Sequence, residues 1–348
     1  MTDLEEFLAG EIEQGSFPGA VALVADADAV TETAASGRAV VEPESVAVSA
    51  ETLFDLASLT KPLVCGGLVA AALPALDLRT PPGRYLPEWK ATRYEDITLE
   101  SLLTHTSGLP AWYPVYARGE GAAQYRRTLA SIEPVAKPGG QVIYSDLNFL
   151  VLGDVLETYF SAGLDAPFTS LVADPAGSGA SFLPGPEAPA AATEKGDVTE
   201  RRMAAALGIS YPHFRTGVVV GEVHDGNAYR RGGVAGNAGL FGTAHDVWQL
   251  ARDWLDSSRR DLTRDRTPDL PEARGLGWQG RRGAGSAVAV MPDSAFGHTG
   301  FTGTSLWIDP DAGRIFVLLT NRIHPVAREV DFNAVRRQFH ERVWQSRA

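Results

Sequence analysis

Ser58 and Lys61 are the residues whose types and spacing point most directly to chemistry. They lie three positions apart in Ser58-Leu-Thr-Lys61, and helix positions i and i+3 share one face, with Cβ atoms about 5–6 Å apart. The lysine then lowers the cost of removing the serine proton, provided that burial or a neighbouring cation depresses its own pKa. Pro62 is tolerated only in a first helical turn, which places Ser58 at a helix N-terminus. The free amides and dipole there favour a developing negative charge, so the pattern predicts a serine nucleophile.

The alternative for this pair is structural. Serine is a favoured helix cap, and a lysine in the first turn is commonly a solvated surface residue. Ser58 and Lys61 therefore need support from other residues before they indicate an active site.

Tyr144 and Asp146 form a second candidate group. They follow Lys137-Pro-Gly-Gly and open a predicted helix, so a phenol and a carboxylate two residues apart can project from a loop into a cleft. A tyrosine near a lysine can act as phenolate and pass a proton between the nucleophile and the leaving group. The structural alternative is a half-buried aromatic ring for Tyr144 and a helix N-cap for Asp146.

His298-Thr299-Gly300 forms a third candidate group, just before an expected strand at 304–308. Glycine there allows a substrate backbone to approach an edge strand closely. The N–H of Phe301 can supply a second oxyanion donor beside that of Ser58. His298 would add a polar or cationic wall; alternatively it is a turn histidine without a role.

The elements that must position these groups can be predicted from hydrophobic periodicity. The expected strands cover residues 17–26, 30–37, 52–57, 287–291, 304–308 and 315–320, and the expected helices cover a segment from Ser58, a short one from Leu99, and 146–160, 245–255 and 326–344. Strands at both ends with helices between them predict an α/β (α+β) fold with one sheet built from the two termini. Residues 1–76 and 241–348 would carry the sheet, residues 77–240 would form a mostly helical half, and the active-site cleft would lie between them.

Composition excludes several classes of protein. With 31 basic and 43 acidic side chains the net charge is −12, and no run of Lys or Arg exceeds two residues, which argues against a nucleic-acid partner. Cys65 is the single cysteine, so no intramolecular disulfide and no thiolate metal cluster can form. The apolar stretch 63–76 is too short to span a membrane, and the start of the chain lacks a secretory signal. The sequence thus predicts a cytoplasmic protein without cofactor or metal, acting on a small molecule; the oligomeric state stays open.

The three groups together make the chain resemble the class C β-lactamase superfamily, which also contains serine esterases, D-amino-acid peptidases and penicillin-binding proteins. The resemblance covers most of the sequence. It is carried by Phe54-Asp-Leu-Ala-Ser-Leu-Thr-Lys-Pro, Arg84-Tyr-Leu-Pro-Glu, Ile97-Thr-Leu-Glu-Ser-Leu-Leu-Thr-His-Thr-Ser-Gly-Leu-Pro, Tyr144-Ser-Asp-Leu-Asn-Phe, Gly236-Asn-Ala-Gly-Leu-Phe and Gly297-His-Thr-Gly-Phe-Thr-Gly.

The resemblance implies an antiparallel sheet in a β-lactamase/transpeptidase-like fold and an acyl-enzyme mechanism. Ser58 would be the nucleophile, Lys61 and Tyr144 the proton-handling pair, and 298–300 the substrate-binding strand. Typical class C β-lactamases carry Lys where this chain has His298 and Asn where it has Asp146, so strong cephalosporinase activity is not expected.

Two further stretches refine the resemblance. His-Thr-Gly is similar to the esterase and peptidase branches. Val223-His-Asp-Gly-Asn-Ala, with the glycine-rich segment after it, is similar to a branch linked to cell-wall fragments, although Asn237 stands where His is expected.

Other hydrolase classes fit less well. The sequence has no Gly-x-Ser-x-Gly, which argues against an α/β-hydrolase, and no His-Glu-x-x-His or comparable histidine cluster, which argues against a zinc hydrolase. His105 is interpreted as structural, and His224 and Asp225 are left outside the catalytic set.

The leading hypothesis is a serine hydrolase that cleaves a small ester or amide through an acyl-enzyme on Ser58, in the first place a carboxylesterase. A D-amino-acid or muropeptide peptidase follows, and a weak β-lactamase comes third. The alternatives from other classes are a penicillin-binding or sensor protein that acylates without turnover, and an inactive scaffold. The acyl group, the leaving group and the stereochemistry cannot be read from the sequence.

Overall fold

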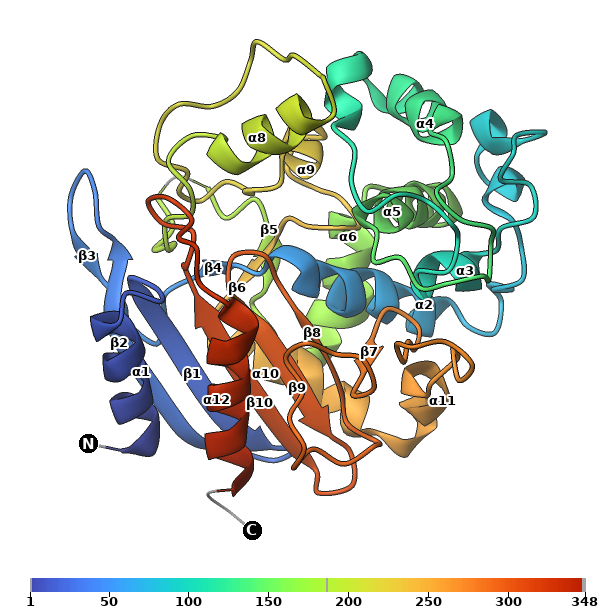
Figure 1. Ribbon diagram of the computed structural model, residues 1–348. Coiled ribbons are helices and arrows are strands. Elements are labelled where there is room, and N and C mark those ends of the chain that lie inside the picture. Colours follow the sequence, from blue (N-terminus) through green and yellow to red (C-terminus); the bar gives the residue numbers. More distant parts are fainter. Residues whose placement is uncertain (1, 186, 346–348) are drawn as a thin grey trace.

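The two ends of the chain meet in one antiparallel sheet of seven strands (Figure 1). The computed structural model describes residues 2–185 and 187–345. Along the sheet the strand order is β3-β2-β1-β10-β9-β8-β7. The strands are β1 (Gly19–Asp26), β2 (Val30–Val40), β3 (Val46–Ala47), β7 (Gln279–Gly280), β8 (Phe296–Thr299), β9 (Ser305–Asp309) and β10 (Arg314–Thr320). The predicted sheet built from both termini is confirmed.

Strand β1 lies near the middle of the sheet because both of its faces are apolar. Its alternate residues Val21, Leu23 and Ala25 pack into the large core shared with the helical region. Ala20, Ala22 and Val24 instead pack into a second core on the opposite face. A strand covered on both faces loses the usual alternation of apolar and polar residues, which explains its continuous apolar run.

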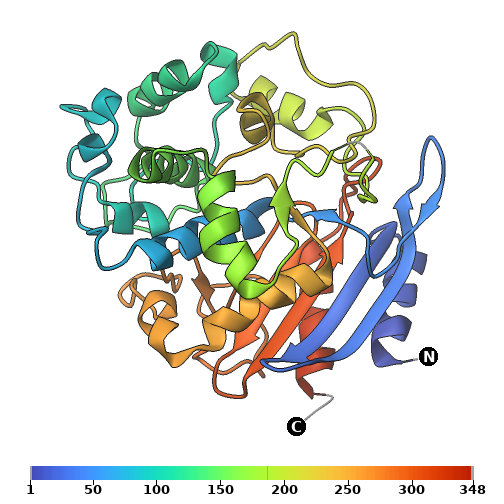
Figure 2. The same cartoon turned by 180° about the vertical axis from the view of Figure 1, so that it is seen from behind.

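Helices cover both faces of the sheet. The helices α1 (Asp3–Glu13) and α12 (Phe332–Gln345) lie side by side on the face of the second core (Figure 1). Helix α10 (Ala244–Arg252) packs against β1 and β10 on the other face (Figure 2). A capping box between Thr2 and Glu5 fixes the start of α1, a helix that the sequence reading missed.

The middle of the chain is mostly helical and sits above the sheet in Figure 1. It also contributes β5 (Ser181–Phe182) to a small sheet with β4 (Phe54–Asp55) and β6 (Leu240–Gly242), in the order β4-β6-β5. The remaining helices are α2 (Gly67–Ala72), α3 (Leu99–Leu103), α4 (Ala122–Ser131), α5 (Asp146–Phe160), α6 (Asp165–Phe168), α7 (Asp174–Ala176), α8 (Val198–Ala206), α9 (Gly226–Arg230) and α11 (Arg260–Thr263).

Several predicted elements differ from the structure. The strand expected at 287–291 is wrong, since the segment joins no ladder among residues 2–185 and 187–345. Val288 and Met291 are buried in the core beneath α12, so their apolar pattern reflects burial alone. The strand expected at 52–57 is only Phe54–Asp55, and α12 begins six residues later than the predicted 326.

No helix in the described part of the chain is long and apolar enough to cross a bilayer.

Candidate active site

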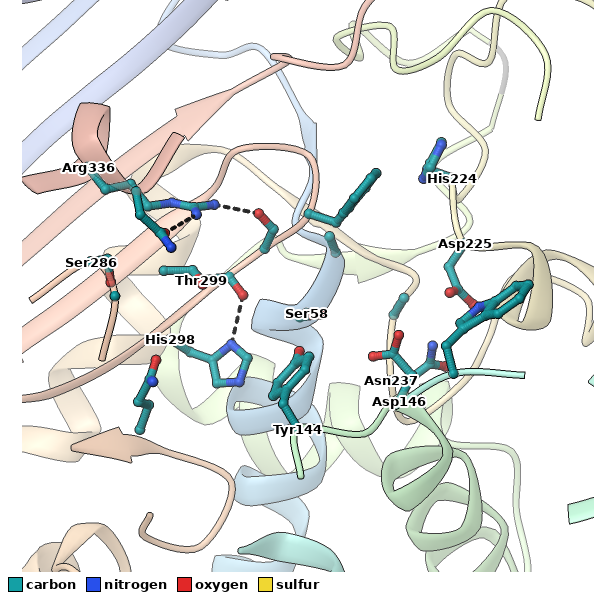
Figure 3. A pocket seen from close by; sticks show the side chains of 18 of the residues that line it. Ser58, Tyr144, Asp146, His224, Asp225, Asn237, Ser286, His298, Thr299 and Arg336 are labelled. Carbon is teal, nitrogen blue, oxygen red and sulfur yellow. Dashed lines mark hydrogen bonds between the residues drawn. The ribbon is translucent and has the colours of Figure 1, made fainter. Parts of the chain in front are cut away.

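A cleft of about 470 Å³ opens between the sheet edge and the helical region. Three segments that are far apart in the sequence bring the predicted groups to its wall: the turn at Ser58, the loop before α5 and the end of β8 (Figure 3). The predicted residues that line it are Ser58, Tyr144, Asp146, His298, Thr299, Gly300 and Phe301.

Ser58 lies on a tight and locally strained turn. Ala57, directly before it, has a φ of 48°, a left-handed conformation that is costly for a residue with a Cβ atom. Its N–H donates to the Asp55 carboxylate at 2.8 Å, which holds the turn in place. The chain then runs through a 3₁₀ turn at Ala57–Leu59 and a π-helical turn at Lys61–Gly66 before α2 begins. A helix that starts at the serine was predicted, but its first turns are not regular α-helix.

Lys61 is fully buried directly beneath the serine. Its Nζ lies 2.8 Å from Ser58 Oγ, 3.0 Å from the carbonyl oxygen of Asn237 and 2.6 Å from Asp146 Oδ1. An ammonium group has three N–H donors and no acceptor. All three donors are therefore engaged, and the nitrogen has no free lone pair to receive the serine proton.

Electrostatics lead to the same protonation state. Burial by itself would lower the pKa of Lys61, but the Asp146 carboxylate and the Tyr144 phenol raise it above its usual value. A lysine that accepts the serine proton needs a depressed pKa, and that condition is not met because the neighbour of Lys61 is a carboxylate and not a cation. We infer that Lys61 stays protonated, that its ammonium orients Ser58 Oγ, and that it stabilises negative charge on this oxygen.

Tyr144 faces the serine from the loop before α5 (Figure 3). The Lys61 ammonium lies 5.2 Å from the centre of its ring. His105 packs 4.7 Å from the same ring and accepts the Ser145 N–H through Nδ1 at 3.0 Å. Through these two contacts His105 holds the Tyr144-Ser145 segment in place.

His298 is buried at the end of β8 and is neutral. Burial, followed by the charges of Lys61 and Arg274, lowers its pKa well below the usual value. Its Nδ1 donates to the Thr299 carbonyl at 2.9 Å, while Nε2 has no partner in the part of the chain that the structure describes. Of the polar or cationic wall expected at His298, the polar alternative fits, because the residue presents a neutral imidazole.

The loop after β8 is hydrogen-bonded to the turn that carries Ser58. Thr302 Oγ1 donates to the Asp55 carbonyl at 2.8 Å, and Thr304 Oγ1 donates to the Leu56 carbonyl at 3.1 Å. A Cβ atom at Gly300 would lie 2.8 Å from the Leu56 carbonyl oxygen, so only glycine fits. The close approach expected at this glycine is thus made by the turn that carries Ser58.

Several residues that the sequence reading did not assign also line the cleft. They are Trp112, Glu200, Arg274, Arg322 and Arg336, together with His224 and Asp225, which were left outside the site, and Asn237. A signal for Arg336 exists: it interrupts the buried stripe of Phe332, Val335, Phe339 and Val343 on α12. Its guanidinium donates to the carbonyls of Gly300 and Thr304 at 2.6 and 3.1 Å.

No group of three or more His, Cys, Asp or Glu side chains within the described residues could hold a metal ion.

The chain is similar to proteins of known family. The family model for Beta-lactamase matches residues 4–339. A proposed D-alanyl-D-alanine carboxypeptidase of Salmonella agona (strain SL483) is 30% identical over 322 residues, which cover 81% of this chain and 72% of the relative.

Solved structures agree on the fold. EstCE1, a hydrolase with promiscuous acyltransferase activity, superposes with a TM-score of 0.74 at 21% identity, covering 98% of this chain and 97% of its own. A class C beta-lactamase superposes with a TM-score of 0.71 at 15% identity, covering 97% and 96% of the two chains.

Proposed function

The chain belongs to the beta-lactamase family, and on that premise we propose that it cleaves a small ester or amide through an acyl-enzyme on Ser58. The observation that supports this most directly is the 2.8 Å contact between Lys61 Nζ and Ser58 Oγ in the cleft. The first candidate activity is that of a carboxylesterase. In support, the neutral His298 takes the place of the lysine expected of a β-lactamase.

The proposed steps give the proton transfer to Tyr144 and the charge stabilisation to Lys61. Tyr144, as phenolate, accepts the proton of Ser58 while Oγ attacks the substrate carbonyl carbon. Lys61 stabilises the charge on Oγ, and the N–H groups of Ser58 and Phe301 are proposed to bind the resulting oxyanion. Tyr144 returns its proton to the leaving group as the ester or amide bond breaks, and water then hydrolyses the acyl-serine by the same route.

A peptidase is the second candidate, because of Arg336. Its guanidinium is buried and has no carboxylate partner in the portion of the chain that the structure describes. Burial, followed by the neighbouring Arg322, lowers its pKa to about 9, so it is still a cation at neutral pH. Such a group suits the terminal carboxylate of a D-alanyl peptide, in line with the proposed activity of the Salmonella relative.

The test is intact mass against time after mixing separately with a short-chain p-nitrophenyl ester, a penicillin and a D-alanyl peptide. With the ester we expect a transient adduct in the wild type that is absent in Ser58→Ala, together with released product. A permanent adduct with penicillin and no product from any substrate would instead show a binding protein. Neither adduct nor product with any of the three would count against the proposed activity and favour the inactive scaffold.

Tyr144→Phe provides a pH test of the proton acceptor. Because the pKa of Lys61 is raised, Lys61 remains charged across neutral pH and cannot produce an alkaline rise in rate there. A phenol accepts a proton only as phenolate, so the wild-type rate should rise toward alkaline pH, and Tyr144→Phe should lower kcat about 10²-fold and flatten that rise. The measurement is kcat between pH 6 and 10 for both proteins, with Tyr159→Phe as the control outside the cleft. An unchanged profile in Tyr144→Phe would remove this residue from the mechanism.

A further inference from the structure

The cleft has two sides of opposite charge. Figure 3 shows His298, Thr299 and Arg336 on one side of Ser58 and Tyr144, and Asp146, Asn237 and Asp225 on the other. Arg322 and Arg274, which is paired with Glu272, also line the cleft. So do Asp55 and Glu200, which accept from the N–H groups of His224 and Gly226, the two neighbours of Asp225 in the sequence.

Some of the acidic groups are already neutralised by the protein. Asp146 is paired with Lys61 at 2.6 Å, and Glu194 is paired with His224 at 3.2 Å. Burial opposes the charge of His224, but the Glu194 carboxylate raises its pKa. Within the part of the chain that the structure describes, no other cation forms an ion pair with an acidic residue on this side.

Asp55, Glu200 and Asp225 have no ion pair among residues 2–185 and 187–345. Both oxygens of Asp55 already accept from backbone, namely from the N–H groups of Ala57 and His224, which leaves Glu200 and Asp225. Glu200 accepts from the Tyr116 hydroxyl at 2.6 Å and from the Gly226 N–H. Asp225 caps α9 by accepting from the Ala228 N–H at 2.8 Å. Both are held by neutral donors only.

The protein itself therefore stabilises these two charges poorly. Burial, and secondarily the nearby Asp225, raises the pKa of Glu200 to about 7. Burial, followed by the charge of Asp146, likewise raises the pKa of Asp225. A cation placed between them would reverse this effect, because an opposite charge favours the ionised carboxyl.

A buried amide independently indicates that a ligand belongs here. Asn237 is 1% exposed and lines the cleft. Its amide lies beside Asp225, where a side-chain hydrogen bond to the carboxyl acts to lower the pKa of Asp225, while its Oδ1 makes no hydrogen bond within the described residues. A buried amide oxygen without a partner costs free energy, so such groups normally have a partner. Its carbonyl oxygen can accept from an N–H donor that reaches the same side as Asp225 and Asp146.

We propose that Glu200, Asp225 and Asn237, here called the ammonium subsite, bind a protonated primary amine of the substrate. The inference rests on the proposed hydrolase function and narrows its substrate class to esters or amides that carry an ammonium group close to the scissile carbonyl. An ammonium offers three donors, which the two carboxylates and the Asn237 oxygen can accept. The half-buried Trp112 ring, which also lines the cleft, can stabilise such a cation further.

The kinetic test uses two isosteric substrates, p-nitrophenyl 3-aminopropanoate and p-nitrophenyl butanoate, which differ only in an ammonium in place of a methyl group. We expect the wild type to favour the amine by about tenfold in kcat/KM, as for a hydrogen-bonded charge. Asp225→Asn, which keeps the helix cap, and Glu200→Gln should each lower this ratio about tenfold. Glu222→Gln, whose exposed side chain lies three residues from Asp225, is the matched control and should leave the ratio unchanged.

A binding experiment tests the ammonium subsite separately from the proposed hydrolase function. It does not depend on whether Asp225→Asn and Glu200→Gln fold. In Ser58→Ala, which cannot turn over, calorimetry compares 3-aminopropanamide with butanamide, and we expect the amine to bind about tenfold more tightly. Equal or weaker binding of the amine, or a wild-type kinetic preference for the butanoate, overturns the ammonium subsite even where Ser58-dependent hydrolysis is intact. Absence of hydrolysis with both esters counts against the proposed function, and the binding experiment then still decides the subsite.

Discussion

Ser58→Ala should lower kcat for a short-chain p-nitrophenyl ester by more than about 10³-fold, because the variant lacks the atom that forms the acyl bond. The fold should be unaffected: Ser58 Oγ contacts Lys61 Nζ, and Lys61 keeps its ion pair with Asp146. Initial rates of p-nitrophenolate release give the activity, and thermal unfolding gives the stability.

The matched control is Ser170→Ala, an exposed serine whose hydroxyl donates to the Ala166 carbonyl of its own helical segment. It should retain wild-type kcat. Turnover of the ester by Ser58→Ala at a rate near that of the wild type would refute the acyl-enzyme mechanism. It would also show that the strained turn at Ala57 serves another purpose.

Lys61→Met should remove activity by about 10³-fold and also destabilise the protein. Activity falls because no cation remains beside Ser58 Oγ. Stability falls by about 3 kcal/mol because the Asp146 carboxylate, only 23% exposed, loses the partner that lies 2.6 Å away. Urea denaturation gives the free energy of unfolding.

A double variant separates the two effects. Lys61→Met with Asp146→Asn removes both charges, so most of the lost stability should return while activity stays low. Lys195→Met, which breaks the exposed ion pair between Lys195 and Glu42, is the control and should change stability by less than about 1 kcal/mol. Wild-type activity in Lys61→Met would show that the buried ammonium is needed for folding alone.

Sequence patterns predicted the helices and strands that are determined by their own residues. The helix at 146–160 has the predicted bounds, since Asp146 opens a long apolar run and Ser161 ends it in a left-handed conformation. The strands at 304–308 and 315–320 are confirmed to within one residue. The pattern at 287–291 failed because an apolar run reports burial, whereas a strand also needs a neighbour with which to pair.

Most residues of the candidate site could be named from the sequence, but their protonation states could not. The contact between Ser58 and Lys61 agrees with their i, i+3 spacing, although the backbone there forms a 3₁₀ turn and a π-helical turn instead of a regular α-helix. The protonation states of Lys61 and His298 depend on burial and on neighbours distant in the sequence, which no local pattern reveals. The same holds for Glu200 and Arg336, which reach the cleft only through tertiary packing.

The hydrogen bonds between the turn at Ser58 and the loop after β8 also determine when the site can form as the chain is synthesised. Asp55 and Leu56 are held by Thr302 and Thr304, nearly 250 residues later in the chain. Strand β1, made among the first residues, likewise acquires its second neighbour only when β10 arrives. Contacts of such long sequence separation form late. During synthesis the turn at Ser58 therefore lacks these partners until the segment up to Thr304 has been made, and we expect the proposed site to assemble only after that point.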